Sequence, residues 1–167
     1  LYPKLLQALI ASWKKHFQRN ELPFYYVQMT PYNWNKQDSG AYNYALFREA
    51  QERSLLLPQT GMVCTMDVGE PDNIHPRNKK PVGERLAALA LHDVYGKNNI
   101  EHSGPRMQSV RFKGNEAIVV FKKNGAGAGL GTSDGAKPKH FFVAGEDHRF
   151  YPANAIIKGR SISLSSS

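Results

Sequence analysis

The sequence predicts an α/β domain followed by a small all-β domain. Helix-like and strand-like segments alternate through the first hundred residues, which is the pattern of a parallel sheet with connecting helices. After that point short alternating segments are separated by turn residues, which is typical of paired antiparallel strands. We therefore place one domain at residues 1–100 and a second at residues 101–167.

Three helices and two strands are expected in the first domain. Apolar residues recur at three- and four-residue steps in three segments, which predicts helices over residues 3–18, 41–57 and 81–95. Continuous apolar and β-branched runs predict two strands, at residues 24–30 and 62–68. Runs without alternation are typical of strands that are buried on both faces of a sheet.

The second domain is predicted from hairpin signals. Residues 106–123 alternate around Gly114 and Asn115, a dipeptide that favours a tight turn between two strands. Residues 155–164 do the same around Gly159 and Arg160. Short strands are also expected within residues 141–145 and 148–151.

Composition narrows the classes of protein. Apolar residues make up 41% and charged residues 22% of the chain, as in folded globular proteins. No apolar run is long enough for a membrane helix. Because Leu1 opens directly on an amphipathic segment, with neither an initiating Met nor a signal peptide, we expect the chain to be a fragment.

The net charge of +8 does not by itself indicate a nucleic-acid partner. Residues 1–100 carry 12 basic and 9 acidic groups, and residues 101–167 carry 10 and 5, so no basic stripe forms. We expect neither a nucleic-acid nor a membrane partner. The one cysteine, Cys64, excludes an internal disulfide and leaves the redox compartment open. Its apolar neighbours predict a buried side chain.

The most informative segment is residues 67–85, which leaves the second strand and enters the third helix. It places His75 three residues after Asp72, just beyond the end of a strand, where parallel sheets bind ligands. A carboxylate at this spacing can accept the Nδ1–H of the imidazole and leave Nε2 free to take a proton. This arrangement indicates the general base of a hydrolase.

A matching nucleophile is not evident. The internal serines that are candidates for the nucleophile are Ser12, Ser39, Ser54, Ser103 and Ser109. A hydrolytic serine usually lies in a tight, glycine-flanked turn, and only Ser39, between Asp38 and Gly40, approaches that setting. Because Ser39 precedes a predicted helix, we interpret it as a helix-start or turn residue.

Metal and cofactor sites are not predicted. The glycines of residues 125–131 alternate and no helix follows them, so we interpret this run as a flexible connection rather than a phosphate loop. The remaining histidines show no metal-ligand spacing: they are His16, His92, His102, His140 and His148. Arg77, Lys79 and Lys80 follow His75 and either attract an anionic substrate or form a solvated helix start.

The sequence resembles the carboxyl-terminal part of the sialate O-acetylesterases, a branch of the SGNH-type serine esterases. The block Ile74-His75-Pro76 is the most specific part of the resemblance. The matching segments, in order, are residues 5–14, 23–29, 48–51, 67–69, 73–79, 82–87, 144–147 and 150–153.

The resemblance implies a flavodoxin-like three-layer α/β/α sheet followed by a small β domain. It also implies removal of O-acetyl groups from sialic acids through an acetyl-enzyme intermediate. His75 would be the general base, and Asp72 would orient it by the D-x-x-H spacing of SGNH enzymes. Asn73 departs from the pattern of sialate esterases that carry Asp two residues before the His, which makes the orienting group less certain than the base.

The nucleophilic serine and most of the oxyanion hole of such enzymes lie upstream of the matching region. We therefore expect another stretch of polypeptide to supply them, an O-acetylated glycan to be the substrate, and this fragment alone to be inactive. The resemblance points to a secreted, periplasmic or lysosomal protein. The alternative is a non-catalytic carbohydrate-binding or accessory module built on the strands of residues 107–164.

Overall fold

The computed structural model describes residues 1–32, 41–123 and 129–166. The chain divides into two compact units, Leu1–Ser103 and Gly104–Ser167. The first unit contains helices and a parallel pair of strands, whereas strands alone form the regular structure of the described part of the second. The predicted mixed α/β class is therefore confirmed.

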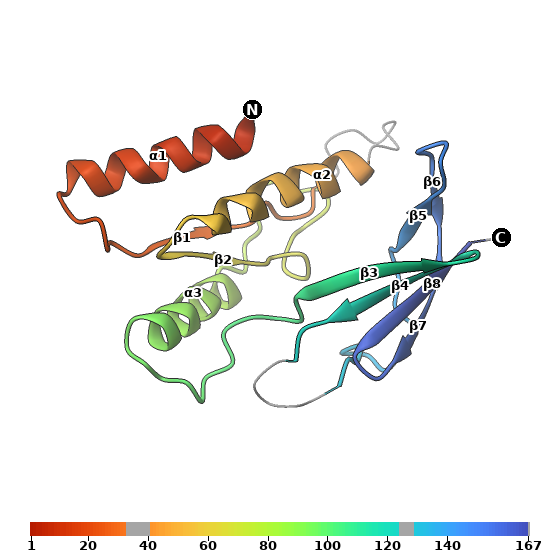
Figure 1. Cartoon of the computed structure of the whole chain (residues 1–167). Helices are drawn as coiled ribbons and strands as arrows, with labels where there is room; N and C mark the ends of the chain where they lie inside the picture. Colours follow the sequence, from red (N-terminus) through yellow and green to blue (C-terminus); the bar gives the residue numbers. More distant parts are fainter. Residues whose placement is uncertain (33–40, 124–128, 167) are drawn as a thin grey trace. The chain divides into compact units, whose positions relative to one another are not determined.

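The first unit contains the three predicted helices and two short parallel strands. Its elements run in the order α1 (Tyr2–His16), β1 (Phe24–Val27), α2 (Ala41–Glu52), the 3₁₀ helix η1 (Arg53–Leu56), β2 (Thr60–Val63) and α3 (Lys80–Asp93). Strands β1 and β2 pair in register from Phe24 opposite Thr60 to Val27 opposite Val63. Figure 1 shows α1 and α2 on one side of these strands and α3 on the other.

Both strands differ from the prediction in length and burial. The second was expected at residues 62–68, but β2 ends at Val63, and β1 ends at Val27 rather than at residue 30. Residues in β2 alternate between buried and half-buried, and none in β1 is fully buried. Each strand has only one neighbouring strand within the described part of the chain, so its faces are incompletely covered.

Cys64 is exposed, so the prediction of a buried thiol is wrong. Side chains alternate between the two sides of an extended segment. Val63 and Thr65 take the buried positions, and the cysteine between them faces outward.

The core of the first unit lies between the helices and the strands. Ile10 of α1, Val63 of β2 and Leu89 of α3 are buried there. A second set of apolar side chains, along α1 and at its C-cap residue Phe17, is partly exposed. Leucines and aromatic residues repeat there at four-residue steps and are about half exposed: Leu5 58%, Leu9 49%, Trp13 49% and Phe17 54%. We call these four residues the α1 stripe.

The described part of the second unit contains six strands. They are β3 (Met107–Lys113), β4 (Glu116–Phe121), β5 (Phe142–Ala144), β6 (Phe150–Pro152), β7 (Asn154–Lys158) and β8 (Ser161–Ser165). Four form an antiparallel sheet in the order β3-β4-β8-β7, and β5 pairs with β6. Gly114 and Gly159 adopt φ values of +55° and +61° in the two predicted hairpin turns, which are confirmed. Ala117, Ala155, Ile162 and Leu164 form the core.

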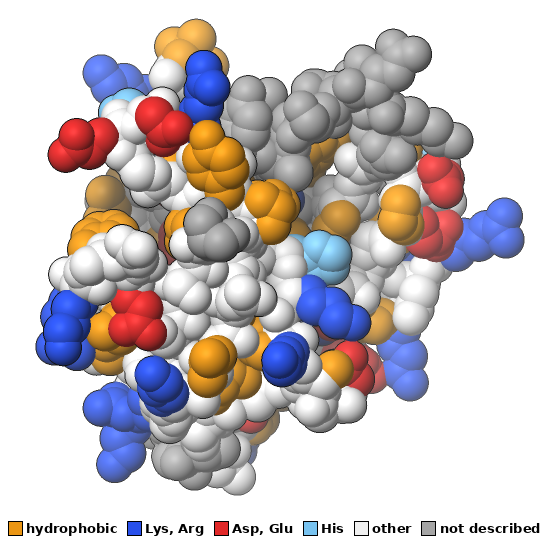
Figure 2. Space-filling view, turned by 90° about the vertical axis from the view of Figure 1, so that its right-hand side faces the viewer, with side chains coloured by type: hydrophobic (Ala, Val, Ile, Leu, Met, Phe, Trp, Pro, Cys, Tyr) orange, Lys and Arg blue, Asp and Glu red, His pale blue; other side chains and the backbone are white. Residues whose placement is uncertain are grey.

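The surface carries no large uniform patch of charge on the face shown in Figure 2, where Lys and Arg side chains are dispersed among acidic and apolar ones. Among the described residues, no helix combines the length and apolar character needed to cross a lipid bilayer.

Candidate active site

The carboxyl ends of β1 and β2 are joined by buried polar contacts. The Thr65 hydroxyl, which is fully buried, donates a hydrogen bond of 2.7 Å to the carbonyl oxygen of Gln28. The side-chain oxygen of Gln51, on α2, accepts a hydrogen bond of 2.9 Å from the backbone N–H of Met29. Buried polar groups that are satisfied in this way fix the positions of the chains that carry them. The loops that leave the two strands therefore start from a rigid base.

A close backbone crossing fixes the start of the His75 loop. A Cβ atom at Gly69 would lie 2.7 Å from the carbonyl oxygen of Pro31, which is closer than real Cβ contacts allow. Only glycine lets the loop after β2 pass the loop after β1 at this distance. This requirement explains the glycine between the strand and the histidine.

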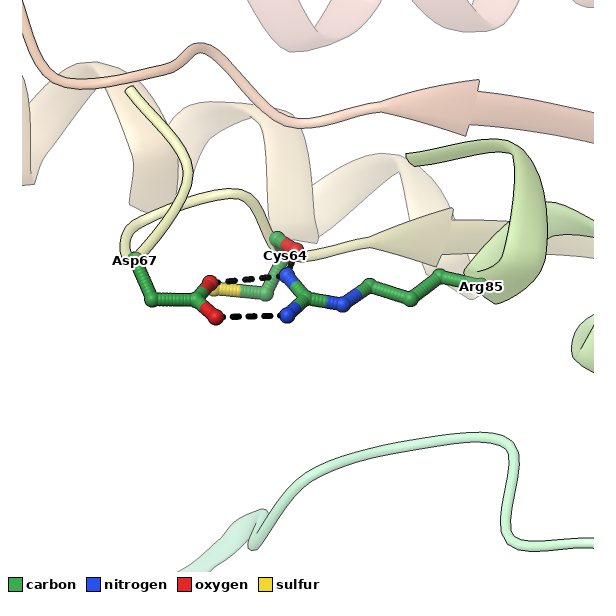
Figure 3. A network of polar contacts seen from close by, with 3 residues as sticks. All are labelled: Cys64, Asp67 and Arg85. Carbon is green, nitrogen blue, oxygen red and sulfur yellow. Dashed lines mark hydrogen bonds and ion pairs between the residues drawn. The ribbon is translucent and has the colours of Figure 1, made fainter. Parts of the chain in front are cut away.

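An ion pair fastens α3 to the loop (Figure 3). The guanidinium of Arg85 donates two hydrogen bonds, of 2.7 and 2.6 Å, to the two carboxylate oxygens of Asp67, and a third of 2.6 Å to the carbonyl oxygen of Cys64. The Arg85 hydrogen bonds lower the pKa of Asp67. The planar guanidinium fits the carboxylate in both position and orientation, so the first turns of α3 are held against the end of β2.

Glu70 and Asn73 close the loop around His75. The Asn73 amide donates to one Glu70 carboxylate oxygen at 2.9 Å, and the backbone N–H of Arg77 donates to the other at 2.6 Å. These two donors lower the pKa of Glu70, the Arg77 N–H first. The Asn73 side-chain oxygen accepts the backbone N–H of His75 at 3.0 Å. Hydrogen bonds therefore hold the loop on both sides of the histidine.

This geometry gives a physical reason for the asparagine. An amide can donate to Glu70 and accept from His75 at the same time. An ionised aspartate at position 73 could not donate, and its charge would repel that of Glu70. Glu70 was missed as a structural residue of this loop, although its three-residue spacing to Asn73 repeats the spacing of Asp72 to His75.

The two predicted catalytic residues lie on the same loop and their side chains are exposed. Pro76, directly after His75, is buried and anchors the loop. Within the described residues, the hydrogen bonds around this loop are made by Glu70 and Asn73, and none joins the side chains of Asp72 and His75. An exposed imidazole on a loop that is held by hydrogen bonds can take a proton from a hydroxyl that another segment delivers. The roles of Asp72 and His75 remain predictions.

Among the residues that the structure describes, no hydrogen bond joins a candidate serine to the side chain of His75. Ser12 is exposed on α1, Ser54 is fully buried on η1, and Ser109 is exposed on β3. Ser103 is half-buried at the end of the first unit. Ser39 lies outside the described residues, as do Gly125 and Gly127 of the predicted flexible connection.

The basic residues that follow His75 are exposed. They are Arg77, Lys79 and Lys80, and Lys80 lies 3.7 Å from Glu84, one turn along α3.

The structure also brings together two histidines and an aspartate that the sequence did not connect, His92, Asp93 and His102. Adjacent residues and a ten-residue gap match no common ligand spacing, so no signal indicated this group.

The Asp67–Arg85 pair predicts a specific acid sensitivity. Because the folded-state pKa of Asp67 lies below its ordinary value of 3.8, the pair stabilises the fold above that pH and stops doing so as the pH falls through the lowered pKa. Asp67→Asn should lower the free energy of unfolding by roughly 0.5 kcal/mol at neutral pH, since the carboxylate is 64% exposed. Once the pH lies well below the lowered pKa of Asp67, the variant and the parent should unfold alike.

Urea unfolding at several pH values measures this effect. Glu84→Gln is the matched control because Glu84 belongs to an exposed pair at 3.7 Å, outside the loop. A difference between Asp67→Asn and the parent that persists unchanged into acid would contradict the assignment.

Comparison with known proteins finds relatives along most of the chain, whereas no protein-family model matches. The sialate O-acetylesterase of Rattus norvegicus is 32% identical over 127 residues, which are 67% of this chain and 23% of that protein. The sialate O-acetylesterase of Homo sapiens is 25% identical over 134 residues, or 71% of this chain and 26% of that protein. The chain thus spans about a quarter of the length of these relatives.

A solved structure has a similar fold. The crystal structure of a carbohydrate acetylesterase from Xanthomonas citri superposes with a TM-score of 0.89 at 34% sequence identity. The superposition covers 99% of this chain and 38% of that one. The mixed α/β arrangement is therefore shared with part of a known acetylesterase.

Proposed function

We propose, from the relationship of this chain to the sialate O-acetylesterases, that it is the part of a carbohydrate O-acetylesterase that carries the catalytic histidine loop. The observation that supports this most is the exposed His75, which lies on a hydrogen-bonded loop beyond the carboxyl ends of two parallel strands. The assignment of residues 1–100 to a flavodoxin-like SGNH domain, and of residues 101–167 to its small β domain, is part of this proposal.

In the proposed reaction, His75 acts as the general base. Its Nε2 takes the proton of a serine hydroxyl, and the serine oxygen attacks the acetyl carbonyl carbon. The tetrahedral intermediate collapses as the imidazolium returns the proton to the departing sugar oxygen. Water then attacks the acetyl-enzyme with His75 again as base, and acetate leaves as the serine regains its proton. Asp72 is proposed to orient the ring once substrate and serine are in place.

The serine is proposed to come from further polypeptide that packs on the first unit. The α1 stripe exposes four large apolar side chains at regular helical spacing, which is typical of a covered face. The sheet has only β1 and β2 among the described residues, so each strand has an edge that another strand can pair with. Because relatives are about four times as long, we propose that a longer protein completes both surfaces. We call it the intact protein.

An O-acetylated sialic acid is the proposed substrate. Sialic acids carry a carboxylate, and Arg77 and Lys79 provide exposed positive charge within four residues of His75. The intact protein should release acetate from an O-acetylated sialic acid more efficiently than from a neutral acetylated xylo-oligosaccharide.

Acetate release under matched conditions tests this preference. Replacing both Arg77 and Lys79 with alanine should raise KM for the anionic substrate by about tenfold and leave the neutral one unchanged. Lys80→Ala is the control, because Lys80 is paired with Glu84. Failure to release acetate from either substrate would contradict the proposed function. Equal activity on both would contradict only the choice of sialic acid.

A further inference from the structure

A second group of potential ligands lies at the far end of α3. His92 and Asp93 are the last two residues of the helix, and His102 lies in the segment that follows. Their nitrogen and oxygen ligand atoms all lie within 4.8 Å of one another. Nδ1 of His92 is 2.7 Å from a carboxylate oxygen of Asp93, and the rings of His92 and His102 stack with centroids 3.6 Å apart.

A tight reversal of the chain creates this group. Gly96 adopts a φ of +65° just after the helix, and the backbone N–H of Lys97 donates to the carbonyl oxygen of Leu91. The backbone N–H of Ile100 then donates to Lys97. These turns lead the chain back along the helix end, so a residue ten positions after His92 reaches its ring.

Asp93 has a further partner that fixes its position. Tyr25 of β1 interacts with the Asp93 carboxylate: the pKa of Tyr25 is raised by burial first, then by the Asp93 charge and by hydrogen bonding to Asp93. The Tyr25 ring packs over Gly61, where a Cβ atom would lie only 2.7 Å from it. Outer contacts of this kind hold a ligating carboxylate in one orientation.

We propose that His92, Asp93 and His102 bind a divalent transition-metal ion, with Zn²⁺ preferred. Two imidazoles and one carboxylate are ligands that Zn²⁺ takes readily, with bonds of about 2.0–2.2 Å. Atoms that already lie within 4.8 Å of one another can reach those distances by rotation of the side chains. One of the stacked rings must turn so that the ion lies in the plane of both, and the part-exposed positions of His92 and His102 leave room for this.

The ion would act on structure rather than on the ester reaction. The His75 loop enters α3 at its first turn, and the cluster lies at its last, about 20 Å away along a helix of 14 residues. A bound ion would hold the segment of residues 94–102 against the end of the helix. Because Asp93 interacts with Tyr25, it would also connect this segment to β1. It should therefore stabilise the first unit.

Titration of the untagged 167-residue chain with Co²⁺, followed by displacement with Zn²⁺, tests the proposal. We expect visible absorption bands that saturate at one Co²⁺ per chain and disappear when Zn²⁺ is added. His92→Gln, His102→Gln and Asp93→Asn should each weaken Zn²⁺ binding by about tenfold or more. His16→Gln and His148→Gln are controls, because both histidines lie outside the cluster, and they should bind as the parent does.

Thermal unfolding of the parent chain is a second test, which does not depend on whether the variants fold. Saturating Zn²⁺ should raise the Tm of the parent chain by roughly 5 °C, and excess EDTA should reverse the rise. Absence of both the absorption bands and the shift would overturn the proposal. Binding that is unaffected by His92→Gln and His102→Gln would also overturn it. Neither readout depends on ester hydrolysis, so failure here is distinct from failure of the proposed function.

Discussion

Replacing His75 with alanine in the intact protein is expected to lower kcat/KM for an aryl acetate by about 10⁴-fold. The loss follows because no other described group on this loop can take the serine proton. Glu70 is already bonded to Asn73 and Arg77, and Asp72 is assigned the orienting role. KM should change little, because the imidazole acts on the reacting atoms rather than on the ground-state complex.

Two variants control for disturbance of the loop and for loss of a histidine as such. Ile74→Ala truncates the exposed neighbour of His75, and His16→Gln removes an exposed histidine from α1. Both should keep kcat/KM within a few-fold of the parent. Full activity in His75→Ala, together with glycan binding by residues 104–167, would favour the alternative of a non-catalytic carbohydrate module.

The 167-residue chain alone is expected to show no saturable hydrolysis of an aryl acetate. A triad enzyme that lacks its nucleophile retains only the catalysis of binding and oxyanion stabilisation. Here the candidate serines lie on α1 (Ser12), on η1 (Ser54), on β3 (Ser109) and at the end of the first unit (Ser103).

Initial rates over a range of substrate concentrations measure this directly. A linear dependence that is the same for the parent and for His75→Ala is the expected result. Saturable turnover by the separate chain, abolished by His75→Ala, would show that the nucleophile is already present. That result would contradict the proposal that it comes from further polypeptide.

Local patterns predicted the helices and hairpins because those elements satisfy their own backbone hydrogen bonds within a few residues. The periodicity behind α1, α2 and α3, and the glycines at positions 114 and 159, act over such short ranges. The strand ends were predicted less well, since burial of a strand depends on neighbours elsewhere in the chain. Cys64 shows this: an apolar run suggested burial, but alternation placed it outward.

The site was predicted only in part, for a similar reason. The position of His75 beyond a strand followed from the order of elements, whereas the Asp67–Arg85 pair joins residues 18 positions apart and has no local signature. The Glu70–Asn73 contact could have been found from spacing alone. The approach of His102 to His92 depends on the turn at Gly96, which a ligand-spacing search does not consider.

The rate at which a fluorophosphonate labels the serine of the intact protein tests the central claim most directly, because labelling requires only a deprotonated hydroxyl and no glycan. Labelling of the parent should be rapid and should slow by about 10³-fold or more in His75→Ala. His16→Gln should label at the parent rate. Equal labelling of the parent and His75→Ala would contradict the account, because the hydroxyl would then be activated by some other group.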